Sequence, residues 1–121
     1  MSSQPSRKRR VEVEDIGDIA VVNFVEKKML DEQSIQMIGD DLFRLVDELG
    51  RRKILLNFGN VEFMSSAALG KLITLHRKLQ AVNGKLVLCK IHKSIFDVFK
   101  ITKLDKILTI APDEQAGLQL F

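Results

Sequence analysis

Apolar and polar residues follow two different periods along this chain, and each change of period marks a predicted element. Residues 11–26 form two short, strand-like stretches around a turn signal at Asp15–Asp18, which predicts a β-hairpin. Residues 30–50 then carry apolar side chains at helical spacing, with acidic residues near the start and Gly50 as a stop. This pattern predicts an amphipathic helix, whose apolar positions are Ile35, Ile38, Leu42, Leu45, Val46 and Leu49.

Short apolar runs alternate with helical patterns in the rest of the sequence. Residues 53–58 and 85–91 are nearly continuous apolar runs, typical of strands that are buried on both faces of a sheet. Between them, a helix is predicted to begin at Ser65 and Ser66, because apolar residues then recur at steps of four and three up to a stop at Asn83–Gly84. A third helical stretch at 92–104, a strand at 107–111 and a terminal helix that starts near Pro112 complete the pattern.

Strands that alternate with helices after a hairpin predict an α/β fold. We expect a mixed, largely parallel sheet of four to five strands with helices packed on it and right-handed crossovers. A chain of 121 residues has room for one core of ordinary size. The sequence therefore predicts one domain over residues 11–121, preceded by a basic tail at residues 1–10.

Composition places the chain among folded proteins of a reducing compartment. Hydrophobic residues make up 45% and charged residues 29%, as in ordinary globular domains. No apolar run approaches the roughly 20 residues that span a bilayer, and the N-terminus lacks an apolar leader, so we expect a cytoplasmic protein. One cysteine and two scattered histidines predict neither a disulfide nor a metal site, and no cofactor is expected.

The net charge of +3 is concentrated at the N-terminus. Arg7, Lys8, Arg9 and Arg10 supply four positive charges, and the other 15 basic and 16 acidic residues leave a net charge of −1 on residues 11–121. Nucleic-acid binding is the alternative that such a tail raises. We disfavour it, because the domain has no tryptophan or tyrosine for base stacking and no obvious basic helix face. A solvated, disordered tail is the prediction.

A search for catalytic residues gives little. The string SAALGKLIT lacks the first glycine of a phosphate-binding loop and has Leu72 where that loop needs serine or threonine. His76 lies ten residues after Ser66 in the same predicted helix, about 15 Å along the axis, too far to act as its base. His92 is expected at the surface, and Cys89 is expected to be a buried, inert thiol. We therefore predict that the chain is not an enzyme.

The adjacent serines Ser65 and Ser66 stand at the start of the second predicted helix. A serine at this position caps a helix by accepting a hydrogen bond from an unpaired amide, which explains one hydroxyl. It does not explain two. The second hydroxyl could instead be a nucleophile or a site of phosphorylation.

The residues around the pair carry a family resemblance over residues 11–121. The stretch NVEFMSSAALGKL, then NGKLVLCKI and IFDVFKITKLDKILTIAPDEQAGL, resembles the STAS domain of bacterial anti-sigma factor antagonists. That family's motif is Asp-x-x-Phe/Tyr-Met-Asp-Ser-Ser/Thr-Gly-Leu-Gly, and Phe63, Met64, Ser66, Leu69 and Gly70 match it. The chain differs at the two aspartates, the Ser/Thr and the first glycine, where it has Asn60, Ser65, Ala67 and Ala68.

The resemblance implies a function and a site. It implies that an anti-sigma factor that is also a serine kinase binds this chain and releases it by phosphorylating Ser66, with Ser65 as the second choice. The implied partner-binding residues are Asp31, Asn60, Met64, Ser65, Ser66, Ala67 and Leu69. A monomer or weak dimer is expected. The alternative is a STAS scaffold without a switch, either in a stress-signalling assembly or as the cytosolic part of a lipid or anion transporter.

Overall fold

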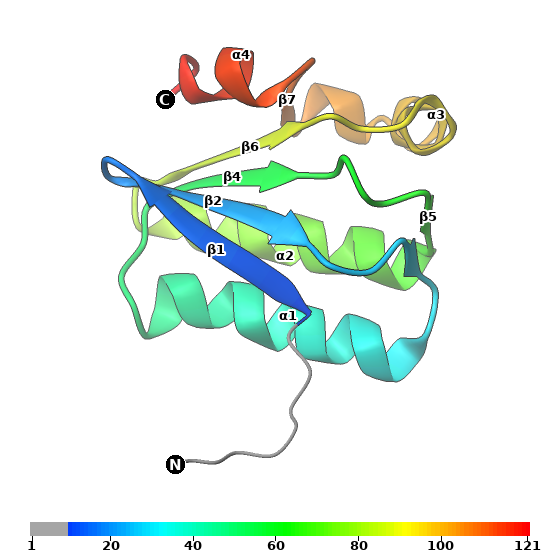
Figure 1. The fold of residues 1–121 in the computed structure, drawn as a ribbon, viewed down its shortest axis with the longest axis horizontal. Helices are drawn as coiled ribbons and strands as arrows, with labels where there is room; N and C mark the ends of the chain where they lie inside the picture. The colour runs from blue at the N-terminus through cyan, green and yellow to red at the C-terminus, as the bar shows by residue number, and fades with distance from the viewer. Residues whose placement is uncertain (1–9) are drawn as a thin grey trace.

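The computed structural model describes residues 10–121, which fold as a sheet with helices on both faces (Figure 1). The strands are β1 (Val11–Ile16), β2 (Ile19–Phe24), β3 (Lys28–Met29), β4 (Lys53–Asn57), β5 (Phe63–Met64), β6 (Lys85–Cys89) and β7 (Thr109–Ala111). The helices are α1 (Glu32–Asp47), α2 (Ser66–Ala81), α3 (Lys93–Ile101), the 3-10 turn η1 (Leu104–Lys106) and α4 (Glu114–Leu118).

Five strands form the main sheet, in the order β1-β2-β4-β6-β7. The β1–β2 hairpin is antiparallel, and each of the other three pairings is parallel. Gly17 has a φ of 62° in the hairpin turn, a left-handed conformation that glycine adopts without a steric penalty. The predicted mixed, largely parallel sheet of four to five strands is confirmed.

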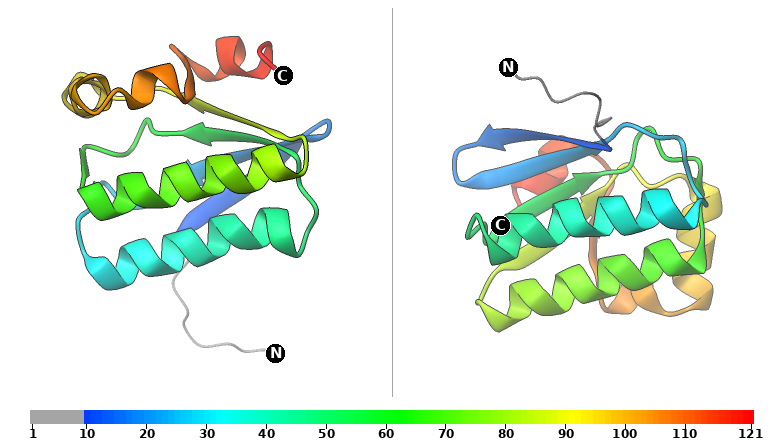
Figure 2. Two further views of the ribbon diagram at one scale, coloured as in Figure 1. Left: turned by 180° about the vertical axis from the view of Figure 1, so that it is seen from behind. Right: turned by 90° about the horizontal axis from the view of Figure 1, so that it is seen from below.

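The core has two parts, one on each face of the sheet. The larger part lies between the sheet and helices α1 and α2, which run side by side on one face of the sheet (Figure 2). The smaller part lies under the short C-terminal helix α4, where Val21, Leu55, Val87 and Cys89 point to the opposite face. Because β4 and β6 are covered on both faces, their central residues are fully or almost fully buried, as their continuous apolar runs predicted.

Three details of the sequence prediction are wrong. The third helix ends at Ile101 rather than at residue 104, and the last strand begins at Thr109 rather than at residue 107. Lys103 adopts a left-handed conformation with a φ of 63°, which breaks the helix and starts the 3-10 turn. The parallel pair of β3 and β5, with two residues in each strand, was not predicted.

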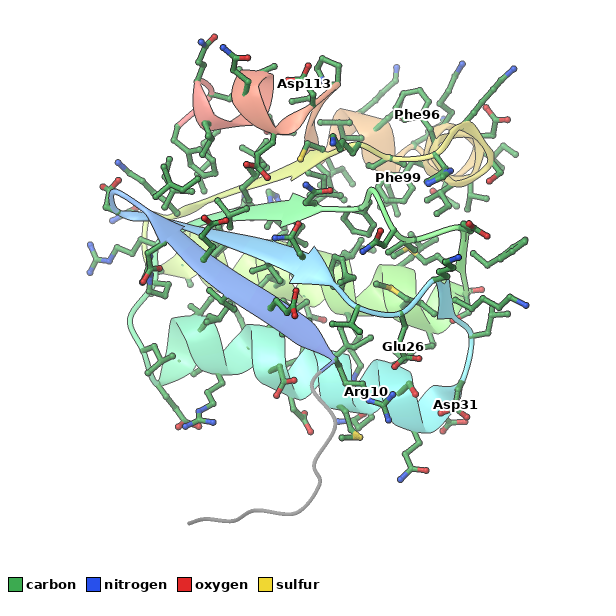
Figure 3. All side chains as sticks on the ribbon, viewed as in Figure 1. Arg10, Glu26, Asp31, Phe96, Phe99 and Asp113 are labelled. Carbon is green, nitrogen blue, oxygen red and sulfur yellow. The ribbon has the colours of Figure 1, made fainter. Side chains whose placement is uncertain are left out.

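Only the last residue of the predicted basic tail lies within the described range. The carbonyl oxygen of Arg10 accepts a hydrogen bond of 3.1 Å from the amide of Val25. The guanidinium of Arg10 forms an ion pair with Glu26 (Figure 3). Arg10 is therefore bound to the domain. The prediction for residues 1–9 lies outside the described residues.

Candidate functional site

The starts of α1 and α2 lie beside each other because the segments that precede them pair as β3 and β5. The amide of Ser65 donates a hydrogen bond of 3.0 Å to the carbonyl oxygen of Met29, and the amide of Glu62 donates one of 2.7 Å to Lys27. These main-chain bonds hold Ser65, the residue before α2, against Met29, which lies three residues before the start of α1 at Glu32. The two helix N-termini thus share one edge of the molecule, which we call the rim (residues 28–36 and 60–71).

Asp31 and Ser65 are the N-caps of the two helices. The Asp31 carboxylate accepts a hydrogen bond of 2.9 Å from the amide of Ser34, and the Ser65 hydroxyl accepts one of 3.3 Å from the amide of Ala68. The bond from Ser34 is the main reason that the pKa of Asp31 is lowered from 3.8. Each side chain thereby satisfies one of the amides that a helix start leaves unpaired.

Ser66 is the first residue of α2, and its side chain is exposed. No hydrogen bond joins its hydroxyl to another residue of the described range, and the cap of α2 comes from Ser65. A hydroxyl at this place is accessible to an incoming enzyme. Any anion formed on it would lie at the positive end of the helix dipole.

An open depression of about 390 Å³ joins the two helix starts. Its lining consists of Leu30, Glu32, Ile35, Gln36, Ser65, Ser66, Ala67 and Lys71. Leu30 is 54% exposed, which is high for a leucine in a small domain. The Lys71 ammonium donates a hydrogen bond of 3.1 Å to Gln36 across the interface of α1 and α2, and it is the only basic group in the lining.

The other predicted partner-binding residues, Asn60, Met64 and Leu69, are not part of the lining of this depression. Asn60 is exposed in the loop before β5, and its amide donates a hydrogen bond of 3.2 Å to the carbonyl oxygen of Phe24. Met64 is half-buried, and Leu69 is only 6% exposed. These two residues line a second, apolar groove of about 150 Å³ between β5 and α3.

The sequence reasoning missed three residues of this surface. Phe63 is 50% exposed and Val98 is 38% exposed on the apolar groove. Phe63 matches the family motif but is not among the implied partner-binding residues, and Val98 reaches the rim only through the packing of α3 against β5. Lys71 is the third, and its one sequence signal is its place one turn after Ala67.

Of the residues considered for catalysis, His92 is exposed and Cys89 lies in the core. Nε2 of His92 donates a hydrogen bond of 3.1 Å to the carbonyl oxygen of Gly59, at the edge of the β4–β5 loop. Cys89 is fully buried in the core under α4, and burial raises the pKa of its thiol to about 11. Within residues 10–121 no group of three or more histidine, cysteine or acidic side chains could hold a metal ion. None of the helices in that range is long and apolar enough to cross a membrane.

Comparisons with known proteins point to one family. The model of the STAS domain family matches residues 10–117. A protein of Bordetella bronchiseptica named as an anti-sigma factor antagonist, BtrV, is 31% identical over 72 residues, which are 60% of this chain and 62% of that protein. The chain thus matches less than two thirds of the length of this relative.

Solved structures agree in fold. An anti-sigma factor antagonist (STAS) domain protein from Planctomyces limnophilus has a TM-score of 0.79 at 20% identity, over 91% of this chain and 95% of that one. The phosphorylated form of Bacillus SpoIIAA has a TM-score of 0.71 at 20% identity, over 92% of this chain and 99% of that one. At 20% identity, these structural similarities show a shared fold and nothing about function.

Proposed function

Because this chain belongs to the STAS domain family, we propose that it is a cytoplasmic, protein-binding regulatory module of the anti-sigma factor antagonist type. In this proposal the rim binds an anti-sigma factor that is also a serine kinase. The kinase phosphorylates Ser66, and the phosphorylated module is released. The chain itself carries no catalytic residue in this scheme and needs no cofactor.

The observation that supports the proposal is the division of roles between the two serines. Ser65 caps α2 with its hydroxyl, whereas the Ser66 hydroxyl is exposed and makes no bond within the described range. Phosphorylation of Ser66 would therefore remove no contact on which the helix depends. The same modification on Ser65 would disrupt the cap, which is why Ser66 is the better acceptor.

A phosphate on Ser66 would act on the partner rather than on the fold. It would carry a charge of about −1.5 to −2 at pH 7, at the end of α2 where the free amides and the dipole favour an anion. The domain should therefore stay folded. A partner surface packed against the start of α2 would have to desolvate this charge, so its affinity should fall.

The apolar residues around Ser66 provide the contact area for such a partner. Leu30 lines the same depression as Ser66, and Phe63, Met64, Leu69 and Val98 line the apolar groove. Exposed apolar side chains next to a polar rim are typical of protein-binding surfaces. The modified hydroxyl would thus lie inside the contact surface, where a new charge has its greatest effect.

The test is a calorimetric titration of the wild type and three variants against each serine kinase of the anti-sigma class from the source organism. Ser66→Asp should bind at least about tenfold more weakly than wild type, which corresponds to about 1.4 kcal/mol. Ser66→Ala should bind like wild type and should not be released when ATP is added. Ser65→Ala is the matched control and should be released normally. Wild-type affinity in Ser66→Asp would refute the switch.

A scaffold without a switch is the second candidate. Four positions of the family motif differ here, and at Ala67 and Ala68 the chain carries methyl groups in place of a hydroxyl and a glycine. Ala68 is buried, but Asn60 and Ala67 are exposed, so these two changes alter the surface that a kinase would recognise. Phosphopeptide mass spectrometry of protein from native cells separates the two candidates, because the scaffold should carry no phosphate on Ser65 or Ser66.

A further inference from the structure

Arg10 holds the segment that leads into the rim. Residues 25–27 connect β2 with β3 and belong to neither strand. The carbonyl oxygen of Arg10 accepts the hydrogen bond from the amide of Val25, and its guanidinium forms the ion pair with the carboxylate of Glu26 (Figure 3). Arg10 therefore binds this segment twice, once through its main chain and once through its side chain.

The guanidinium of Arg10 also contacts α1 and is shielded from water. Its Nη2 lies 3.9 Å from the sulfur of Met37, and its Nε is buried without a hydrogen-bond partner in the described range. The side chains of Arg10 and Glu26 are 21% and 29% exposed, whereas every other ion pair within residues 10–121 has at least one side chain that is half exposed or more. Loss of one partner would leave the other charge partly buried and unpaired, so this pair should contribute more than a surface pair.

Main-chain hydrogen bonds connect the held segment to the start of α2. The carbonyl oxygen of Lys27 accepts bonds of 2.7 Å and 3.2 Å from the amides of Glu62 and Phe63. Two residues later, the carbonyl oxygen of Met29 accepts the bond of 3.0 Å from the amide of Ser65. Because β3 and β5 have two residues each, this pairing has few bonds of its own. The position of Ser65 therefore depends on how firmly the segment before β3 is held.

The charge of Arg10 also acts on the N-cap of α1. The pKa of Asp31 is lowered chiefly by the hydrogen bond from Ser34, and the positive charge of Arg10 adds to this effect. Arg10 thus influences both helix starts of the rim. It acts on the start of α1 through its charge, and on the start of α2 through the bonds that join β3 to β5.

We infer that Arg10 is a positioning residue for the rim. Its guanidinium holds Glu26 beside α1, and the carbonyl groups that follow Glu26 in the chain fix β5 and the residue before α2. A partner does not have to touch Arg10 for this effect. The consequence for binding rests on the proposed function, because a loosened rim would have to become ordered when a kinase binds.

Hydrogen exchange of the free protein, followed residue by residue by NMR, tests the inference without a partner. Arg10→Met removes the charge but keeps an unbranched side chain beside Met37. The amides of Glu62, Phe63 and Ser65 should then exchange at least about tenfold faster than in wild type, because they open locally with the segment that Arg10 holds. The amides of Ala116 and Gly117 in α4, far from Arg10 in the fold, should keep their wild-type rates.

Arg51→Met is the matched control. It removes the same charge from the ion pair of Arg51 with Asp15, which joins β1 to the segment after α1. It should leave the exchange of the three rim amides unchanged. Wild-type exchange of these amides in Arg10→Met, or the same acceleration of these amides in Arg51→Met, would overturn the inference.

Two more variants show whether the ion pair is responsible. Glu26→Gln should accelerate the same three amides, and Arg10→Met/Glu26→Gln should differ from wild type by less than the two single effects combined, because each single change already breaks the pair. Additive effects would overturn the inference.

Binding is measured separately. A kinase that binds wild type should bind Arg10→Met at least about threefold more weakly and Arg51→Met equally well. Equal affinity for Arg10→Met would overturn the role of Arg10 in binding. If no kinase binds wild type, the proposed function fails, and hydrogen exchange still decides whether Arg10 positions the rim.

Discussion

Exchanging each of the two adjacent serines for alanine should have opposite effects on stability. Ser65→Ala removes the hydroxyl that accepts the Ala68 amide and leaves that amide unpaired at the start of α2. Loss of a serine N-cap costs about 0.5–2 kcal/mol. The bond is 3.3 Å long, toward the weak end of such contacts, so we expect a loss of about 0.5–1 kcal/mol in the free energy of unfolding.

The expected shift in melting temperature follows from the size of the domain. An unfolding entropy of about 2.1 cal/mol/K per residue gives roughly 0.25 kcal/mol/K for this chain, so Ser65→Ala should lower the Tm by about 2–4 °C. Ser66→Ala removes an exposed hydroxyl and places a better helix former at the first helical position. Its Tm should be equal to or slightly above that of wild type.

Ser66→Asp completes the series. The carboxylate lies at the positive end of α2 and should stabilise the helix by about 0.3–1 kcal/mol at low salt. Differential scanning calorimetry of the wild type and the three variants gives all shifts under one condition. If Ser66→Ala destabilises the protein more than Ser65→Ala, the capping role belongs to Ser66, and the reasoning that leaves the Ser66 hydroxyl available for phosphorylation is refuted.

Three other outcomes can be tested on the purified protein. Burial raises the pKa of the Cys89 thiol from 9.0 to about 11, so titration of this thiol should have no effect on the free energy of unfolding below pH 9 and should lower it between pH 9 and 11. The measurement is urea unfolding at a series of pH values, and a profile that stays flat between pH 9 and 11 would contradict this. Gly84→Ala would place a Cβ 2.5 Å from the Arg52 carbonyl oxygen and should cost about 1–3 kcal/mol, whereas Gly70→Ala, which meets nothing within 4 Å, should be neutral or stabilising. The protein should neither hydrolyse ATP nor phosphorylate itself, and radiolabel that appears without added kinase would contradict a binding module.

The main sheet could be predicted from the sequence because its strands carry strong local signals. The apolar runs of β4 and β6 exist because helices cover both faces of these strands, and the helical periods of α1 and α2 reflect the core below the sheet. The end of α3 could not be read in this way. Lys103 adopts a left-handed conformation that the sequence would indicate only through glycine or asparagine.

The helix start at the two serines could be predicted from the sequence, but the way the chain brings it beside the start of α1 could not. Ser65 and Ser66 stand out in the sequence as a helix start, and the structure assigns the cap to Ser65. It also shows that Asp31 caps α1, a role that the sequence reasoning had not assigned to it. The pairing of β3 with β5 has two residues on each side, too few to show any period. Phe63 and Val98 come together only through the packing of α3 against β5, so no local pattern marks them as neighbours.

The pairing of β3 with β5 has a kinetic consequence for any protein that docks at the rim. Main-chain bonds hold Ser65 to Met29 and Glu62 to Lys27, so the two helix starts are already in place before a partner arrives. Little of the rim has to become ordered when a partner binds. Association should therefore be a single step without a slow rearrangement of this chain. A charge on Ser66 would then shorten the lifetime of the complex and leave the speed of its formation nearly unchanged.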